Sequence, residues 1–180
     1  MNVTFPKASG SPKPKDPNII IIDCEDVLTH PTRDAKGVKI VGDIILKPGA
    51  KAFATYVTPS TITRGDESDG DPDAEGFTQK VTCEKPGDEL SWNEFVQNKI
   101  TADLIVITSE CSRTSGTRMH GTKCNPMKLK YTGVDTKDAQ KSTIEFTQVQ
   151  RGEYKSGFYS GAIPDIQAST PEESSEESSI

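Results

Sequence analysis

Apolar and polar residues alternate along much of this 180-residue chain, the pattern of strands with one buried face. Between Met127 and Tyr131 the apolar side chains fall on one side and two lysines on the other. Comparable runs predict further strands at 18–23, 38–46 with a break at Gly42, 52–57, 77–83, 104–107, 143–149 and 158–163. Short strands separated by Gly, Pro and Asp predict an all-β fold, a sandwich or barrel of two antiparallel sheets.

One segment has the helical period instead. Its apolar residues recur at intervals of three and four and predict one flanking α-helix near 91–101. Ser91 is the predicted N-cap, with Glu94 as its capping-box partner. The residues of the apolar face are Trp92, Phe95, Val96 and Ile100.

The two ends of the chain differ in composition from the middle. Residues 1–17 contain four prolines and three lysines, which predicts an extended arm. Residues 165–180 are rich in Ser and Glu and have little to bury, which predicts a disordered acidic tail. Residues 18–164 are therefore the predicted β-sandwich domain.

A stretch of nineteen residues, 58–76, separates two of the predicted strands and is predicted to be a long acidic loop. It carries the carboxylates of Asp66, Glu67, Asp69, Asp71, Asp73 and Glu75. A calcium loop counted from Asp69 lacks its glycine, because Ala74 stands there, and lacks its final glutamate, because Lys80 stands there. We therefore predict a solvated or partner-contacting loop without metal. The tripeptide Arg64-Gly65-Asp66 is short enough to occur by chance.

The net charge of −6 and the absence of a basic face argue against tight nucleic-acid binding. No apolar run approaches the roughly 18 residues of a membrane span, so no membrane contact is expected. The first residues, Met1–Lys7, have no apolar stretch of the secretory type, and no secretory signal is expected.

Cysteine and histidine offer little for chemistry. Cys24, Cys83, Cys111 and Cys124 have no zinc-ribbon spacing, and reduced thiols without metal or cofactor are the prediction. A three-ligand site of Cys111, His120 and Cys124 is the alternative. His30 and His120 are each predicted to be exposed. With no nucleophile elbow, phosphate loop or zinc-protease motif, we predict a protein that is not an enzyme, with no catalytic residues.

Several segments together resemble tail-tube (major tail) proteins of phages that infect Bacteroidetes-type hosts. The resemblance covers about residues 18–164. The segments that carry it are Asp73–Phe77, Glu94–Asn98, Asp103–Ile107, Arg118–Pro126, Thr143–Gly152 and Phe158–Gly161.

The resemblance implies two packed antiparallel sheets, a flanking helix, an N-terminal arm and a long hairpin loop. It also implies self-association into rings, expected to be hexameric, that stack into a tube in the virion tail after assembly in the host cytoplasm. DNA would pass through without specific binding, and other virion proteins would be partners. The alternatives are a head–tail connector, a tail terminator, a capsid decoration protein or a non-viral β-sandwich binding module.

Overall fold

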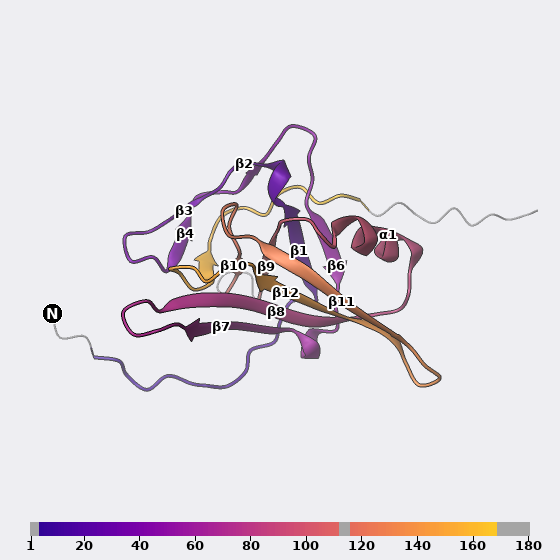
Figure 1. Cartoon of the computed structure of the whole chain (residues 1–180), viewed down its shortest axis with the longest axis horizontal. Coiled ribbons are helices and arrows are strands. Elements are labelled where there is room, and N and C mark those ends of the chain that lie inside the picture. Colours follow the sequence, from indigo (N-terminus) through magenta and orange to yellow (C-terminus); the bar gives the residue numbers. More distant parts are fainter. Residues whose placement is uncertain (1–3, 112–115, 169–180) are drawn as a thin grey trace, which may run out of the picture.

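The computed structural model describes residues 4–111 and 116–168 (Figure 1). Within them the chain forms thirteen strands, one α-helix and two short 3-10 helices. The elements are, in order, β1 (Asn18–Asp23), η1 (Cys24–Asp26), β2 (Val27–Thr29), β3 (Thr32–Arg33), β4 (Lys39–Val41), β5 (Ile45–Leu46), β6 (Phe53–Tyr56), η2 (Pro59–Thr61), β7 (Thr63–Asp69), β8 (Gly76–Pro86), α1 (Leu90–Lys99), β9 (Leu104–Thr108), β10 (Arg118–His120), β11 (Met127–Asp135), β12 (Gln140–Gln148) and β13 (Gly157–Tyr159). The all-β prediction with one helix is confirmed.

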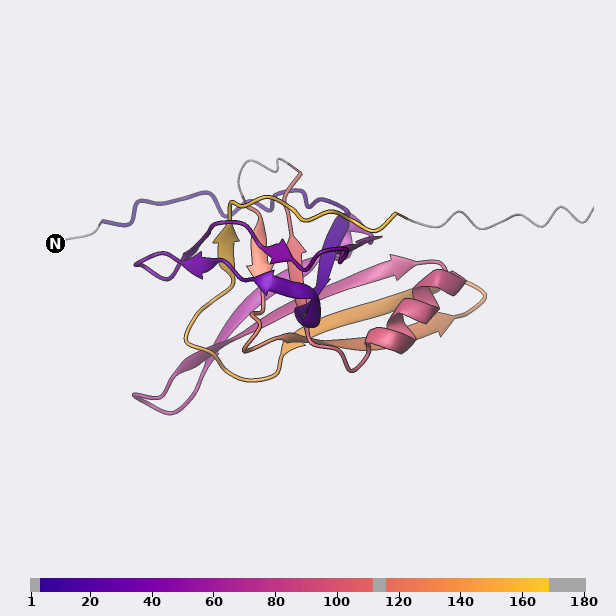
Figure 2. The same ribbon diagram turned by 90° about the horizontal axis from the view of Figure 1, so that it is seen from above.

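Eleven strands share one hydrogen-bonded network that bends into two layers, and β2 and β5 form a small separate pair. One layer runs β3, β4, β13, β10, β9, β1 and β6; the other runs β11, β12, β8 and β7. The two layers join where Met127 pairs with Leu104. Figure 2 shows the long strands of the second layer crossing the shorter strands of the first. All pairs are antiparallel except β13 with β4.

The strands β1 and β9 lie in the middle of the molecule and bury both of their faces. Every residue from Ile19 to Asp23 and from Leu104 to Thr108 is buried. On one face Ile19 and Ile21 belong to a core shared with β8, β11, β12 and α1. On the other, Ile20 and Ile22 pack with the covering segment that contains Ile40. The near-continuous apolar runs in the sequence follow from this double burial.

Helix α1 turns Trp92 and Val96 toward the core, as the helical period predicts. It begins at Leu90, and its N-cap is Glu89, which makes no side-chain capping bond. The predicted cap at Ser91 is wrong because the Glu89 carbonyl already accepts the first helical bond, from the Asn93 amide. Within the described residues no helix is long and apolar enough to cross a membrane.

The prediction of a loop over 58–76 is wrong for most of its length. Residues 59–61 form the 3-10 helix η2, and residues 63–69 form strand β7, which pairs with β8 over seven residues. The longest stretch without regular structure is the hairpin tip between Asp69 and Gly76. The strand forms because Arg64 and Asp66 turn inward and bind Glu110 and Ser156, which are far away in the sequence. Nothing in the local sequence indicates those partners.

The boundaries of the arm and the tail also differ from those predicted, because the domain includes residues assigned to each of them. The arm is exposed from Thr4 to Pro14, but its base is tied down, because Lys15 bridges to Glu110. At the other end Ile166 pairs in parallel with Ala52, so the domain extends past residue 164. The rest of the predicted disordered tail, residues 169–180, lies outside the described residues.

Candidate assembly interface

Three strands of the described network have an edge with no strand partner: β3, β7 and β6. A fourth edge, on β11, is paired only at Met127 and carries Lys128, Lys130 and Asp135. An open edge offers unpaired backbone groups to other chains, and natural proteins protect such edges by shortness or by charge. Strand β3 is only two residues long. Strand β7 carries Arg64, Asp66, Glu67 and Asp69. Strand β6 is twice as long as β3 and has no charge to protect it, because Phe53–Tyr56 contains no charged residue.

The outer edge of β6 is occupied only at its beginning. Ala52 donates to the Asp165 carbonyl at 2.9 Å and accepts from the Gln167 amide at 2.8 Å. Because backbone groups alternate between the two edges of a strand, Ala54 and Tyr56 present theirs to the same side. Within the described part of the chain β6 pairs only with β1, so this side has no strand beside Ala54 and Tyr56.

A groove of about 580 Å³ lies between β6 and α1. Its floor is aromatic: Phe53 meets Phe95 edge-on with ring centroids 4.9 Å apart, and Phe95 stacks on Trp92 at 5.4 Å. The Trp92 indole donates to the Ser142 hydroxyl at 3.3 Å, which fixes the ring against β12. Aromatic floors of this kind bind large apolar side chains.

The charged side chains around the groove differ in whether they have a partner: the lysines do, and the glutamates do not form ion pairs within the described residues. Lys99 is held by Asp23 at 2.7 Å, and Lys85 lies over the Trp92 ring at 5.4 Å from its centroid. Glu89 and Glu94 also line the groove and are exposed. No ion pair to either glutamate is found among residues 4–111 and 116–168. The rim therefore offers two carboxylates to a cationic partner.

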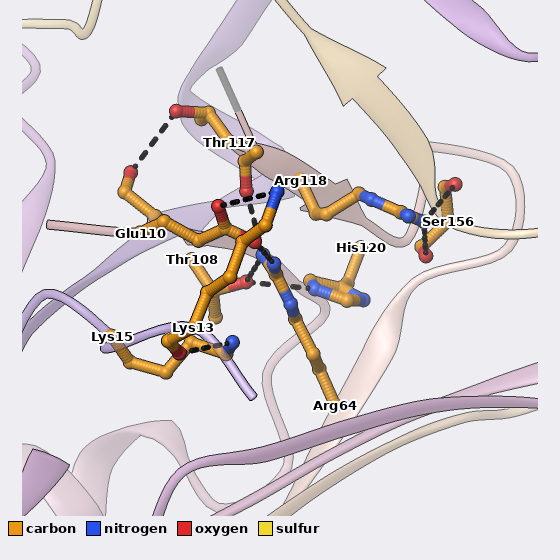
Figure 3. Close-up of polar contacts among 11 residues, drawn as sticks. Lys13, Lys15, Arg64, Thr108, Glu110, Thr117, Arg118, His120 and Ser156 are labelled. Carbon is orange, nitrogen blue, oxygen red and sulfur yellow. Dashed lines mark hydrogen bonds and ion pairs between the residues drawn. The ribbon is translucent and has the colours of Figure 1, made fainter. Parts of the chain in front are cut away.

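A second polar cluster anchors the base of the arm (Figure 3). The Arg64 guanidinium donates to the Glu110 carboxylate at 2.8 Å and to the Gly116 carbonyl at 2.7 Å. Lys13 of the arm lies 3.9 Å from the same carboxylate. The arm therefore leaves the domain at a cluster of Arg64 from β7 and Glu110 and Gly116 from the residues that follow β9. We call this cluster the charged seat.

His120 lies inside this cluster with 0% of its surface exposed, so the prediction of an exposed imidazole is wrong. Its Nε2 is 3.1 Å from the Thr108 hydroxyl, and its Nδ1 has no partner within the described residues. Burial lowers the pKa of His120 to about 3, and the nearby Arg64 and Arg118 cations act in the same direction, while the Asp66 carboxylate raises it. A histidine that stays neutral here is a structural group of the core. The other histidine, His30, is half-buried with its Nδ1 2.7 Å from the Pro31 carbonyl.

Asp66 links β7 to the C-terminal strand. Its carboxylate accepts from the Ser156 amide at 2.9 Å and from the Ser156 hydroxyl at 2.8 Å. Arg118 also donates to the Ser156 hydroxyl, at 3.2 Å, and its guanidinium lies 3.8 Å from the centroid of the Phe158 ring. The inward residues of the supposed acidic loop are therefore fixed parts of the domain.

The residues considered for metal binding are not brought together. Among residues 4–111 and 116–168, no three His, Cys, Asp or Glu side chains are grouped as a metal site requires. Cys24 and Cys83 are buried, whereas Cys111 and Cys124 are exposed, and all four thiols are free. Burial raises the pKa of Cys24 and of Cys83 to about 12, and for Cys24 the neighbouring Asp103 and Asp23 add to the effect.

The sequence missed the groove because its lining comes from five separate segments: β1, β6, the end of β8, α1 and residues 167–168. The sequence showed the alternation of Phe53 and Thr55 and the helical face at Trp92 and Phe95. It did not show that these two surfaces lie side by side.

Comparison with known proteins gave no matching family model, no matching curated protein and no matching solved structure.

Proposed function

We propose that this protein is a self-assembling structural subunit of the tail-tube type, whose copies associate side by side into rings that stack around a conduit for DNA. The observation that carries the proposal is the uncharged open edge of β6. Its neighbour in the fold is a groove with an aromatic floor. A surface of this composition is stable in solution when another chain covers it.

The edge of β7 is charged, unlike that of β6, and this difference supports the same proposal. A subunit that joins its neighbours in one defined way needs one receptive edge and protection of the others. Glu67 and Asp69 lie exposed along β7 and repel a strand of like charge. The net charge of −6 suits a conduit along which DNA phosphates move without binding.

The test is the oligomeric state of the purified full chain, measured by light scattering during size-exclusion chromatography and by negative-stain microscopy. Concentration-dependent growth into rings or tubes with a central channel is expected. A chain that stays monomeric up to its solubility limit contradicts the proposal. So does a discrete oligomer that never extends, which would favour a connector or terminator role, and so does stabilisation by calcium without self-association.

A pair of charge substitutions connects assembly to the β6 edge. Ala54→Lys places an ammonium group on an exposed position of β6 and should abolish assembly while leaving the melting temperature close to that of the wild type. Glu67→Lys makes a comparable change on β7 and serves as the control that still assembles. Loss of assembly in both variants, or in neither, refutes a specific role for β6.

A further inference from the structure

The arm carries the most exposed large apolar residue among the described residues. Phe5 has 89% of its surface exposed, and it is followed by Pro6 and Lys7 in a segment that touches solvent throughout. Single exposed apolar residues are common on proteins. An aromatic ring at the end of an extended arm is different, because the arm can deliver it to another molecule.

We propose that the groove between β6 and α1 binds the N-terminal arm of a second copy of this chain, with Phe5 on the aromatic floor and the arm backbone added as a strand to the outer edge of β6. This inference rests on the proposed function and names the contact by which one subunit holds the next. Addition of a strand to a sheet edge combines backbone hydrogen bonds for affinity with side-chain pockets for specificity.

The chemistry of arm and groove is complementary at three points. The outward backbone groups of Ala54 and Tyr56 provide hydrogen bonds to an added strand. The rings of Phe53, Phe95 and Trp92 provide an apolar contact for Phe5. The exposed carboxylates of Glu89 and Glu94 match the positive charge of Lys7, the charged residue of the arm beyond its anchored base at Lys13 and Lys15.

The chain's own C-terminal residues are the competing occupant, since Gln167 and Ala168 reach the groove. Their sequence is poorly suited to it. Residues 169–180 contain no aromatic residue and four glutamates, which would lie beside Glu89 and Glu94. The arm offers an aromatic ring and the opposite charge, so the observations favour the arm.

The positions of arm and groove favour contact between copies. The arm runs toward one end of the long axis of the molecule, and α1 lies toward the other end, in both views (Figures 1 and 2). A contact between two different surfaces at opposite ends is heterologous, and such contacts propagate into rings or filaments. The charged seat of Arg64 and Glu110 fixes where each arm begins and so limits the directions available to the next subunit.

The experiment measures arm binding without requiring tubes. A fluorescein-labelled peptide of residues 4–15 is titrated with the full chain carrying Phe5→Ser, whose own arm is a poor competitor, and anisotropy reports binding. Saturable binding is expected. Phe5→Ser in the peptide should weaken binding about tenfold or more, as should Ala54→Pro in the chain, which removes the outward amide of β6. Leu28→Ser, at an apolar residue 60% exposed elsewhere, is the control that leaves binding unchanged.

Each result separates the arm contact from the proposed function. No peptide binding to the full chain, or equal binding by the Phe5→Ser peptide, overturns the arm contact even if the wild-type protein forms tubes. Peptide binding that emerges only after deletion of residues 169–180 assigns the groove to the chain's own terminus and also overturns it. Binding with the expected losses, in a protein that never forms rings or tubes, upholds the arm contact and refutes the proposed function.

Discussion

Arg64 and Glu110, 46 residues apart in the chain, form an ion pair at 2.8 Å in which both side chains are nearly buried, with 14% and 15% of their surfaces exposed. The pair joins β7 to the residues that follow β9, and Glu110 also bridges to Lys15 of the arm. Gly116 completes the seat by accepting from Arg64, and its φ of +84° lies in the left-handed region that favours glycine. Glu110 thus holds β7 through its side chain and the base of the arm through a backbone β-bridge.

We predict that Glu110→Ala lowers the free energy of unfolding by about 3 kcal/mol, because it leaves the Arg64 cation nearly buried without its counter-ion. Urea denaturation followed by circular dichroism measures the loss. Lys80→Ala is the matched control: it breaks an ion pair with Glu145 in which the lysine is 45% exposed, and it should cost less than about 1 kcal/mol. Equal losses in the two variants would show that burial does not distinguish the pairs.

Removal of the Trp92 ring tests the packing of α1. Trp92 is 6% exposed, stacks on Phe95 and donates to Ser142, so Trp92→Ala should cost about 3–5 kcal/mol. Trp92→Phe keeps an aromatic ring at this position and should recover more than half of that loss. If the alanine variant loses less than about 1 kcal/mol, α1 contributes little to the core.

Strand and helix positions could be predicted from the sequence where a local period governs burial. The alternation of Met127, Leu129 and Tyr131 indicated β11, and the spacing of Trp92 and Val96 indicated α1. The run of β-branched residues at 18–23 indicated β1, and its burial on both faces was found only in the structure. In these segments the side chains themselves decide which face is buried.

The sequence did not predict the structure where a partner distant in the chain determines whether a residue is buried. Arg64 and Asp66 look solvated beside so many carboxylates, yet Glu110 and Ser156 hold them in β7. His120 stands next to a glycine and looks exposed, but β9 on one side and β13 on the other enclose its strand. The groove was missed for the same reason, since its residues meet only in the folded chain.

Reactivity of the thiols follows burial. We predict that 5,5′-dithiobis(2-nitrobenzoic acid) rapidly modifies Cys111 and Cys124 in the native protein, and modifies Cys24 and Cys83 only on unfolding. Both buried thiols have a pKa raised to about 12, so little thiolate is available even without the steric barrier. Mass spectrometry of the labelled peptides identifies the sites. Rapid labelling of Cys24 or Cys83 in the native state would contradict their placement in the core.

The buried imidazole of His120 should make the folded protein sensitive to mild acid. Its folded-state pKa is lowered to about 3, chiefly by burial, while in the unfolded chain it returns to about 6.5. As the pH falls below 6.5 the unfolded state takes up a proton that the folded state does not. The stability contribution is therefore complete above pH 6.5 and is lost progressively toward pH 3, by about 1.4 kcal/mol per pH unit once the unfolded imidazole is protonated.

The measurement is the free energy of unfolding in urea between pH 7 and pH 5, a range in which most carboxylates stay ionised. His120→Gln removes the titrating group and can still hydrogen-bond Thr108, so its stability should fall less steeply with acid than that of the wild type. His30→Gln is the control, because His30 is only half-buried, although burial also lowers its pKa. His120→Gln should therefore reduce the acid dependence of the free energy of unfolding more than His30→Gln does. If His120→Gln and the wild type have parallel pH profiles, the imidazole is accessible to protons in the folded state, and its complete burial beside Thr108 is wrong.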